Sequence, residues 1–104
     1  MSKCEINPGI CGLVTTVEAK SIEGGNVTLK IISDCPNIQK VAEELVEINP
    51  FDEIFKRAAT TKTYEVVSKH SPHPSCPVPS GILKAVEVEA GLALPKDVSI
   101  KIEK

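Results

Sequence analysis

The sequence predicts a small α+β domain with a mostly antiparallel three-stranded sheet and helices packed on one face. Apolar and polar residues alternate within residues 13–33 and again over residues 97–103, as they do in half-buried strands. Between these segments, residues 36–48 and 77–92 show the three-to-four-residue apolar spacing of amphipathic helices. A hairpin, several helices and a closing C-terminal strand, in that order, give a small sheet covered on one side.

The predicted hairpin spans residues 13–33. Its apolar residues occupy odd positions on both strands, and Glu23-Gly24-Gly25 lies between them as a three-residue loop with a left-handed glycine. Because the inward residues are odd-numbered on both strands, paired residue numbers should sum to about 48. This register places Cys11 at the same end of the hairpin as Cys35.

The remaining elements follow from proline positions and apolar spacing. Residues 1–10 are polar and broken by Pro8-Gly9, so we expect a mobile arm. Proline is favoured in the first turn of a helix, where its missing N–H costs nothing. The expected helices are Pro36 to Ile48, a short one from Pro50, Tyr64 to Lys69, and Pro77 to about Leu92. A strand over residues 97–103, in which Val98, Ile100 and Ile102 share one face, closes the sheet.

Composition excludes several classes of function. A chain of 104 residues with 41% hydrophobic and 25% charged residues is expected to be a single domain, residues 1–104. A net charge of −2 and only three aromatic residues argue against a nucleic-acid surface. No apolar run reaches membrane length, and the N-terminus lacks a signal-peptide pattern. We therefore expect a cytoplasmic protein whose four cysteines are thiols or ligands, not disulfides.

Three of the four cysteines stand where predicted elements begin. Cys11 precedes a strand, whereas Cys35 and Cys76 each precede a proline that opens a helix. The N–H groups at a helix start favour the thiolate over the thiol. Thiolates, with an imidazole, are the ligands of zinc and of iron–sulfur clusters. The sequence therefore predicts a site for zinc or an iron–sulfur cluster formed by Cys11, Cys35 and Cys76, with His73 as a further metal ligand.

Each candidate also has a structural interpretation. Free cysteine often acts as a small buried apolar residue, and a histidine on a Pro/Ser-rich connector such as His73 is usually just exposed. His70 ends a predicted helix, where its charge complements the dipole. Cys4 lies on the expected arm as an extra ligand, a redox thiol or a residue without function. No P-loop, dinucleotide-binding or HExxH motif occurs, and we favour a binding protein over an enzyme.

The order of these features resembles the NifU/IscU family of iron–sulfur cluster scaffold proteins. The matching features are Cys11-Gly12-x-Val14, a hairpin, Cys35 before a helix, and a histidine and Cys76 before a long helix with Ile82-Leu83-Lys84-Ala85. Members of that family assemble clusters on three cysteines, helped by an aspartate and a histidine. Over residues 11–90, the resemblance implies that the three cysteines are ligands of an iron–sulfur cluster. It also implies a cysteine desulfurase and cluster-accepting proteins as partners.

The chain departs from that family at three places. Leu13 stands where the family has the aspartate that helps hand the cluster on. Ser75 stands where a histidine directly precedes the last cysteine, so His73 would substitute for it. The third strand is expected from the C-terminus, whereas in that family it precedes the first cysteine. These departures favour a stably held metal or cluster over a general assembly platform.

Three functions remain open. The leading interpretation is a metal- or cluster-binding protein, as a scaffold or carrier. The alternatives are a thiol enzyme or sulfur carrier with Cys76 as nucleophile, and an interaction module whose cysteines are structural. We expect neither nucleic acid nor membrane as a partner, and a monomer or small homo-oligomer. The segments Cys76-Pro77-Val78-Pro79 and Leu92-Ala93-Leu94-Pro95 also resemble a family of small proteins from anaerobic microbes that has no assigned function.

Overall fold

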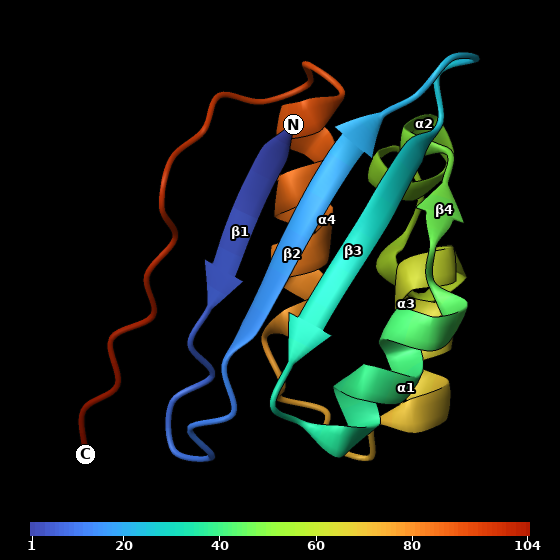
Figure 1. The fold of residues 1–104 in the computed structure, drawn as a ribbon. Coiled ribbons are helices and arrows are strands. Elements are labelled where there is room, and N and C mark those ends of the chain that lie inside the picture. The colour runs from blue at the N-terminus through green and yellow to red at the C-terminus, as the bar shows by residue number, and fades with distance from the viewer.

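The computed structural model describes residues 1–104, in which an antiparallel sheet forms one layer and helices form the other (Figure 1). The strands lie in the order β1-β2-β3-β4 and are β1 (Ser2–Ile6), β2 (Thr15–Ser21), β3 (Val27–Ser33) and β4 (Glu47–Ile48). The helices are α1 (Pro36–Glu44), α2 (Pro50–Ile54), α3 (Lys62–His70) and α4 (Val78–Glu89), with a 3₁₀ turn, η1 (Ala58–Thr60), before α3. The predicted α+β class with an antiparallel sheet is confirmed.

The β2–β3 hairpin forms in the predicted register. Val17 pairs with Ile31, and Ala19 pairs with Leu29. The N–H of Ile22 donates to the carbonyl of Asn26 at 2.9 Å, which closes the loop over residues 23–25. Gly24 has a φ of 95°, a conformation that other residues adopt only with strain. The odd-numbered inward residues therefore fixed the pairing correctly.

The predictions for the two chain ends are wrong. Residues 1–10, expected as a mobile arm, contain β1, which pairs with β2 from Ser2 opposite Ala19 to Ile6 opposite Thr15. Residues 97–103, expected as the closing strand, contain no strand and run outside the sheet along β1 (Figure 1). The sheet has four strands, not three, because β1 and the two-residue β4 flank the hairpin. Ile48 belongs to β4 and pairs with Val27 of β3. The predicted helix from Pro36 to Ile48 therefore ends earlier, and α1 stops at Glu44.

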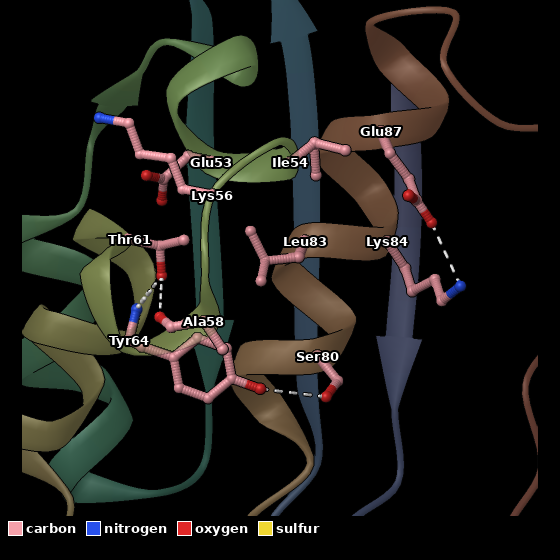
Figure 2. Close-up of a pocket in the computed structure, with 10 residues that line it drawn as sticks. All are labelled: Glu53, Ile54, Lys56, Ala58, Thr61, Tyr64, Ser80, Leu83, Lys84 and Glu87. Atoms are coloured by element: carbon pink, nitrogen blue, oxygen red, sulfur yellow. Dashed lines mark hydrogen bonds and ion pairs between the residues drawn. The ribbon is translucent and has the colours of Figure 1, made fainter.

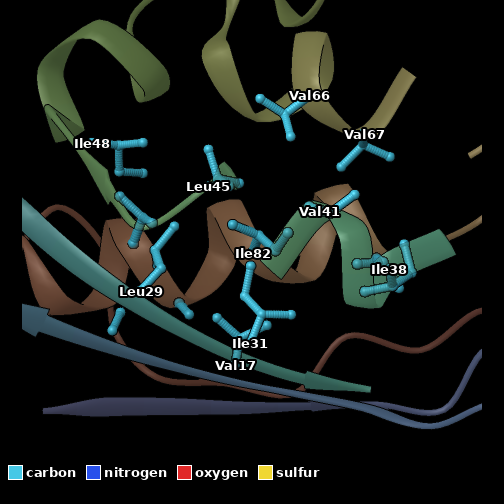
Figure 3. Packing of buried hydrophobic residues seen from close by; sticks show 14 of the residues in the cluster. Val17, Leu29, Ile31, Ile38, Val41, Leu45, Ile48, Val66, Val67 and Ile82 are labelled. Atoms are coloured by element: carbon cyan, nitrogen blue, oxygen red, sulfur yellow. The ribbon is translucent and has the colours of Figure 1, made fainter. Parts of the chain in front are cut away.

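The hydrophobic core fills the space between the sheet and the helices. Figure 3 shows Val17, Leu29 and Ile31 of the sheet close to Ile82 of α4, with α1 and α3 packed beside them. The other face of the sheet carries exposed Lys20 and Lys30. Helices therefore cover one face only, as predicted. No helix is both long enough and apolar enough to cross a membrane.

A buried carboxylate joins α2 to α3. Glu53 is only 4% exposed, and its two oxygens accept hydrogen bonds from the N–H groups of Lys62 and Thr63 at 2.9 and 2.8 Å. The side chain of Thr61 accepts a further bond from the N–H of Tyr64 at 3.1 Å. These contacts satisfy N–H groups that a helix start leaves without partners. They explain why α3 begins at Lys62, two residues before the predicted start at Tyr64.

Helix α4 is fastened to β1 at two places. Near its start, Gly81 lies so close to Ile6 that a Cβ at position 81 would overlap the Ile6 side chain. At its end, Glu89 accepts hydrogen bonds from the N–H of Ser21 at 2.8 Å and the hydroxyl of Ser2 at 2.9 Å. The Ser21 bond is the main reason that the pKa of Glu89 falls to about 2. These contacts fix the position of the residues just before α4.

Candidate functional site

Three connecting segments meet at one end of the sheet, the lower end in Figure 1. They are the turn after β1, the β3–α1 junction and the α3–α4 connection. Together they enclose a pocket of about 190 Å³. Its lining residues are Pro8, Cys11, Leu13, Cys35, Asn37, Ile38, Ser71, His73, Cys76 and Val78. The three predicted cysteines and His73 therefore share this pocket, which we call the cysteine pocket.

Cys35 reaches the cysteine pocket from the start of α1. It is the N-cap residue of that helix, in an extended conformation with φ −82° and ψ 121°, and Pro36 follows it as predicted. Its sulfur makes no capping hydrogen bond, and its own N–H donates to the hydroxyl of Ser33 at 3.0 Å. The backbone is thus held from the β3 side, while the half-buried sulfur is free to contact a ligand.

Cys76 lies slightly further from its helix than the sequence indicated. The N-cap residue of α4 is Pro77 and the helix begins at Val78, so Cys76 stands just before the cap. The N–H of Cys76 donates to the carbonyl of His73 at 3.2 Å, which forms a tight turn. The turn joins His73 to Cys76, and both residues line the pocket.

Cys11 is the exposed member of the set. It lies in the turn between β1 and β2, where the N–H of Gly12 donates to the carbonyl of Gly9 at 3.0 Å. Gly12 has a φ of 67°, in the left-handed region that favours glycine. A hairpin register in which paired numbers sum to 48 puts position 37 opposite Cys11, and Asn37 does line the cysteine pocket.

His73 is partly engaged already. Its Nε2 lies 2.9 Å from the hydroxyl oxygen of Ser75, and the ring is exposed. Ser75 occupies the position at which the resemblance places a histidine. A ligand at Nε2 would displace this hydrogen bond, whereas Nδ1 makes no hydrogen bond within the chain.

The chemistry of the cysteine pocket suits a soft metal, but its donors are not closed around a common point. Three thiols and one imidazole are a ligand set for zinc or an iron–sulfur cluster. No three His, Cys, Asp or Glu side chains of the chain are grouped so that they hold a metal ion in this conformation. Coordination therefore requires the donors to move together, and Cys11 is the one thiol of the three that is exposed.

The fourth cysteine and the second histidine lie outside the cysteine pocket. Cys4 is on β1, half-buried near Gly81, and not on a mobile arm. Burial and, to a smaller extent, the charge of Asp97 raise the pKa of the Cys4 thiol. His70 ends α3 as predicted, and its Nε2 lies 3.0 Å from Oε1 of Glu44. Together with Lys69, this histidine lowers the pKa of Glu44.

A second pocket, of about 280 Å³, is larger and more open than the cysteine pocket (Figure 2). It lies among α2, η1, α3 and α4. On one side the Tyr64 hydroxyl lies 3.5 Å from that of Ser80, and on another Lys84 and Glu87 form an ion pair at 3.2 Å. No cysteine or histidine lines it. Because its polar groups contact one another, we place the candidate site in the smaller cysteine pocket.

The fold and its site define a small α+β protein with a thiol-lined pocket at one end of its sheet. The chain belongs to a family of proteins of unknown function, DUF6951, whose family model matches residues 2–102. The match includes β1, all positions of the cysteine pocket and most of the C-terminal segment. No curated protein and no solved structure matches the chain.

Proposed function

We propose that this protein binds zinc or an iron–sulfur cluster in the cysteine pocket. Cys11, Cys35 and Cys76 supply thiolates, and His73 is the fourth donor. The observation that carries the proposal is their convergence: residues from three separate segments line one pocket of about 190 Å³. Cysteines that act only as small buried apolar residues have no need to gather in one pocket.

Exposure of the thiols supports a ligand role over a structural one. None of the four cysteines belongs to the fully buried core; Cys11 is exposed and the other three are partly buried. A cysteine that merely fills space would lie deeper. The pocket wall nevertheless includes Leu13, Ile38 and Val78, and such apolar side chains limit the access of water to bound thiolates.

The order of elements supports the likeness to the NifU/IscU scaffold proteins. A strand, β1, precedes Cys11, so the chain has the strand that this resemblance implies ahead of the first cysteine. Leu13, at the position of the family's aspartate, lines the same pocket as the cysteines. We propose a carrier or scaffold that holds its metal more tightly than a transfer platform. A cysteine desulfurase and cluster-accepting proteins are its proposed partners.

Metal analysis of protein purified without oxygen tests the proposal. We expect bound metal in the full chain, and a visible absorption band if it is an iron–sulfur cluster. Cys35→Ser and Cys76→Ser should each lose the metal. Cys4→Ser is the matched control, because Cys4 lies outside the cysteine pocket, and it should retain the metal. Full retention in a Cys35→Ser/Cys76→Ser double variant would rule out the proposal.

A thiol nucleophile at Cys76 is the second candidate function. The observation in its favour is that His73 shares the pocket with Cys76, since a neighbouring histidine activates such nucleophiles. Alkylation of metal-free protein separates the two functions. A nucleophile predicts that Cys76 reacts far ahead of Cys11 and Cys35, whereas a metal site predicts no such gap. Cys4, whose pKa is raised, provides the slow reference.

A further inference from the structure

The C-terminal segment has the pattern of a strand but pairs with nothing. Val98, Ile100 and Ile102 alternate with Ser99, Lys101 and Glu103, yet no residue after Leu92 takes part in a backbone hydrogen bond. Ile100 is 77% exposed and Ile102 is 88% exposed. Three β-branched side chains on one side of an extended segment are costly to leave in water. The family model reaches residue 102, so this segment belongs to the domain that the family shares.

The sheet offers a matching open edge. β1 is the outermost strand and pairs only with β2, so every second residue of it directs its N–H and C=O away from the sheet. Its outward side chains, Lys3 and Glu5, are exposed, whereas Cys4 and Ile6 face the helices, where both lie near Gly81 of α4. The opposite edge strand, β4, has only two residues and therefore exposes far fewer unpaired N–H and C=O groups. β1 is therefore the place where a further strand can add.

Among antiparallel pairings with β1, charge complementarity selects one register. On the solvent face Lys3 pairs with Glu18, and Glu18 pairs with Lys30, so a row of alternating charge already crosses three strands. An antiparallel segment with Glu103 opposite Lys3 extends this row by one residue of the correct sign. The same register places Lys101 opposite Glu5. Opposite charges directly across a sheet stabilise pairing, and like charges oppose it.

This register also places the apolar residues correctly. Ile102 then lies opposite Cys4, and Ile100 lies opposite Ile6. Both isoleucines thereby face the helix layer, where Ile6 is buried next to Gly81 of α4. A slip by one residue would turn them toward water and bring the charged residues to the apolar side. Charge and hydrophobicity thus agree on one antiparallel pairing.

The direction of the segment indicates which molecule supplies the added strand. Helix α4 ends where β1 begins, since Ser2 bonds to Glu89, and the segment then runs along β1 in the same direction (Figure 1). A chain's own segment is therefore parallel to its own β1. The antiparallel register becomes available when the segment comes from a second copy related by a two-fold axis.

We infer that this protein forms a dimer by strand exchange, in which residues 100–104 of each copy pair antiparallel with β1 of the other. The occupant of the open edge is the second copy of this chain. The exchange covers Ile100 and Ile102, pairs the free edge of β1 and adds one strand to each sheet. The cysteine pockets of both copies are not part of the exchanged pairing.

Mass in solution tests the dimer. Light scattering with size exclusion, on the full chain over a range of concentrations, should give twice the monomer mass. Ile100→Glu should shift the equilibrium to the monomer. Ser99→Glu is the matched control, because Ser99 lies on the polar side of the segment, and it should remain dimeric. A monomer at every concentration, or a dimer that Ile100→Glu leaves unchanged, overturns the inference.

Charge reversal and crosslinking test the register. Lys3→Glu should raise the dimer dissociation constant, and adding Glu103→Lys should restore it. Under mild oxidation, Ile102→Cys should form a disulfide with Cys4 between two chains, because directly opposite residues in an antiparallel pair have the spacing of a disulfide. Peptide mass mapping and a non-reducing gel identify the bond. A disulfide within one chain, or failure of the charge swap to restore binding, overturns the register.

Discussion

At the scale of single residues, chemistry and position separate the four cysteines into two groups. Cys11, Cys35 and Cys76 line one pocket, and Cys4 packs between β1 and α4. The grouping of Cys11 with Cys35 was predictable, because the hairpin register brings the two ends of the hairpin together. The position of Cys76 was not, since it depends on how α4 docks against β1. Local sequence does not encode that long-range contact.

Leu13 is the residue whose exchange is most informative for the proposed site. It lines the cysteine pocket at the position where the resemblance places an aspartate. We expect Leu13→Asp to speed release of the bound metal to a chelator by about tenfold or more, as changes beside a metal's ligands commonly do. Release can be followed by absorption of a coloured chelator complex.

Leu13→Asn is the control for this prediction, since it has a similar shape to aspartate without the charge. It should release metal more slowly than Leu13→Asp. Equal release from Leu13→Asp and the unaltered protein would show that this position does not govern transfer.

At the scale of elements, the contact between α4 and β1 depends on Gly81. Alanine is favoured over glycine within a helix by about 1 kcal/mol, so helix propensity alone predicts that Gly81→Ala stabilises the protein. A Cβ at position 81 overlaps Ile6, and overpacking of this kind costs roughly 1–3 kcal/mol. We therefore expect a net loss of stability in urea unfolding.

A double-mutant cycle isolates the cause. In an Ile6→Ala background the overlap is gone, and Gly81→Ala should be neutral or stabilising there. If Gly81→Ala destabilises both backgrounds equally, the contact with Ile6 is not the reason for glycine at this position.

The hydrogen bonds of Glu89 make the same junction sensitive to acid. The pKa of this group is lowered from 4.5 to about 2, chiefly by the Ser21 N–H. A lowered pKa in the folded state adds stability that is present above pH 4.5 and is lost as the pH falls toward 2. Glu89→Gln should therefore reduce the unfolding free energy at pH 7 by about 1–3 kcal/mol.

The pH dependence distinguishes this role from simple packing. The difference between Glu89→Gln and the unaltered protein should shrink between pH 4.5 and about 2. Urea unfolding at a series of pH values measures it. A difference that is the same at every pH would mean that the carboxylate charge is irrelevant.

The sequence predicted an element correctly where the pattern within that element was sufficient. It failed where the structure depends on which neighbouring strand is available for pairing. The hairpin register and the starts of α1 and α2 follow from alternation and from proline positions. Residues 2–6 also alternate, with Cys4 and Ile6 on one side, but the run is short and was obscured by the following Pro8. Residues 97–103 alternate as clearly as β3 does, and they still form no strand within the chain. Alternation shows that a segment suits a sheet; it does not supply the neighbouring strand.

At the scale of the whole molecule, metal binding and folding should be linked. The proposed ligands come from three connecting segments, so the complete pocket exists only in the native fold. A ligand that binds only the native state raises stability by about 2.7 kcal/mol at a concentration of 100 times its dissociation constant. We expect zinc or iron to raise the Tm of the full chain, with a larger effect at higher pH because thiols lose protons on binding.

Cys35→Ser supplies the comparison for this linkage. Its Tm should not respond to added metal, whereas that of Cys4→Ser should rise as in the unaltered protein. If added metal still raised the Tm of Cys35→Ser, the binding site would lie elsewhere on the molecule.

The arrangement of the cysteine pocket has a consequence for the order of events during synthesis. Two of its thiols precede residue 40, but Cys76 is translated much later, after three helices have been made. A nascent chain that ends before Cys76 holds an incomplete set of donors. If the pocket binds the proposed metal, loading must wait until Cys76 has been made, and a bound metal would mark chains that have passed this point of synthesis.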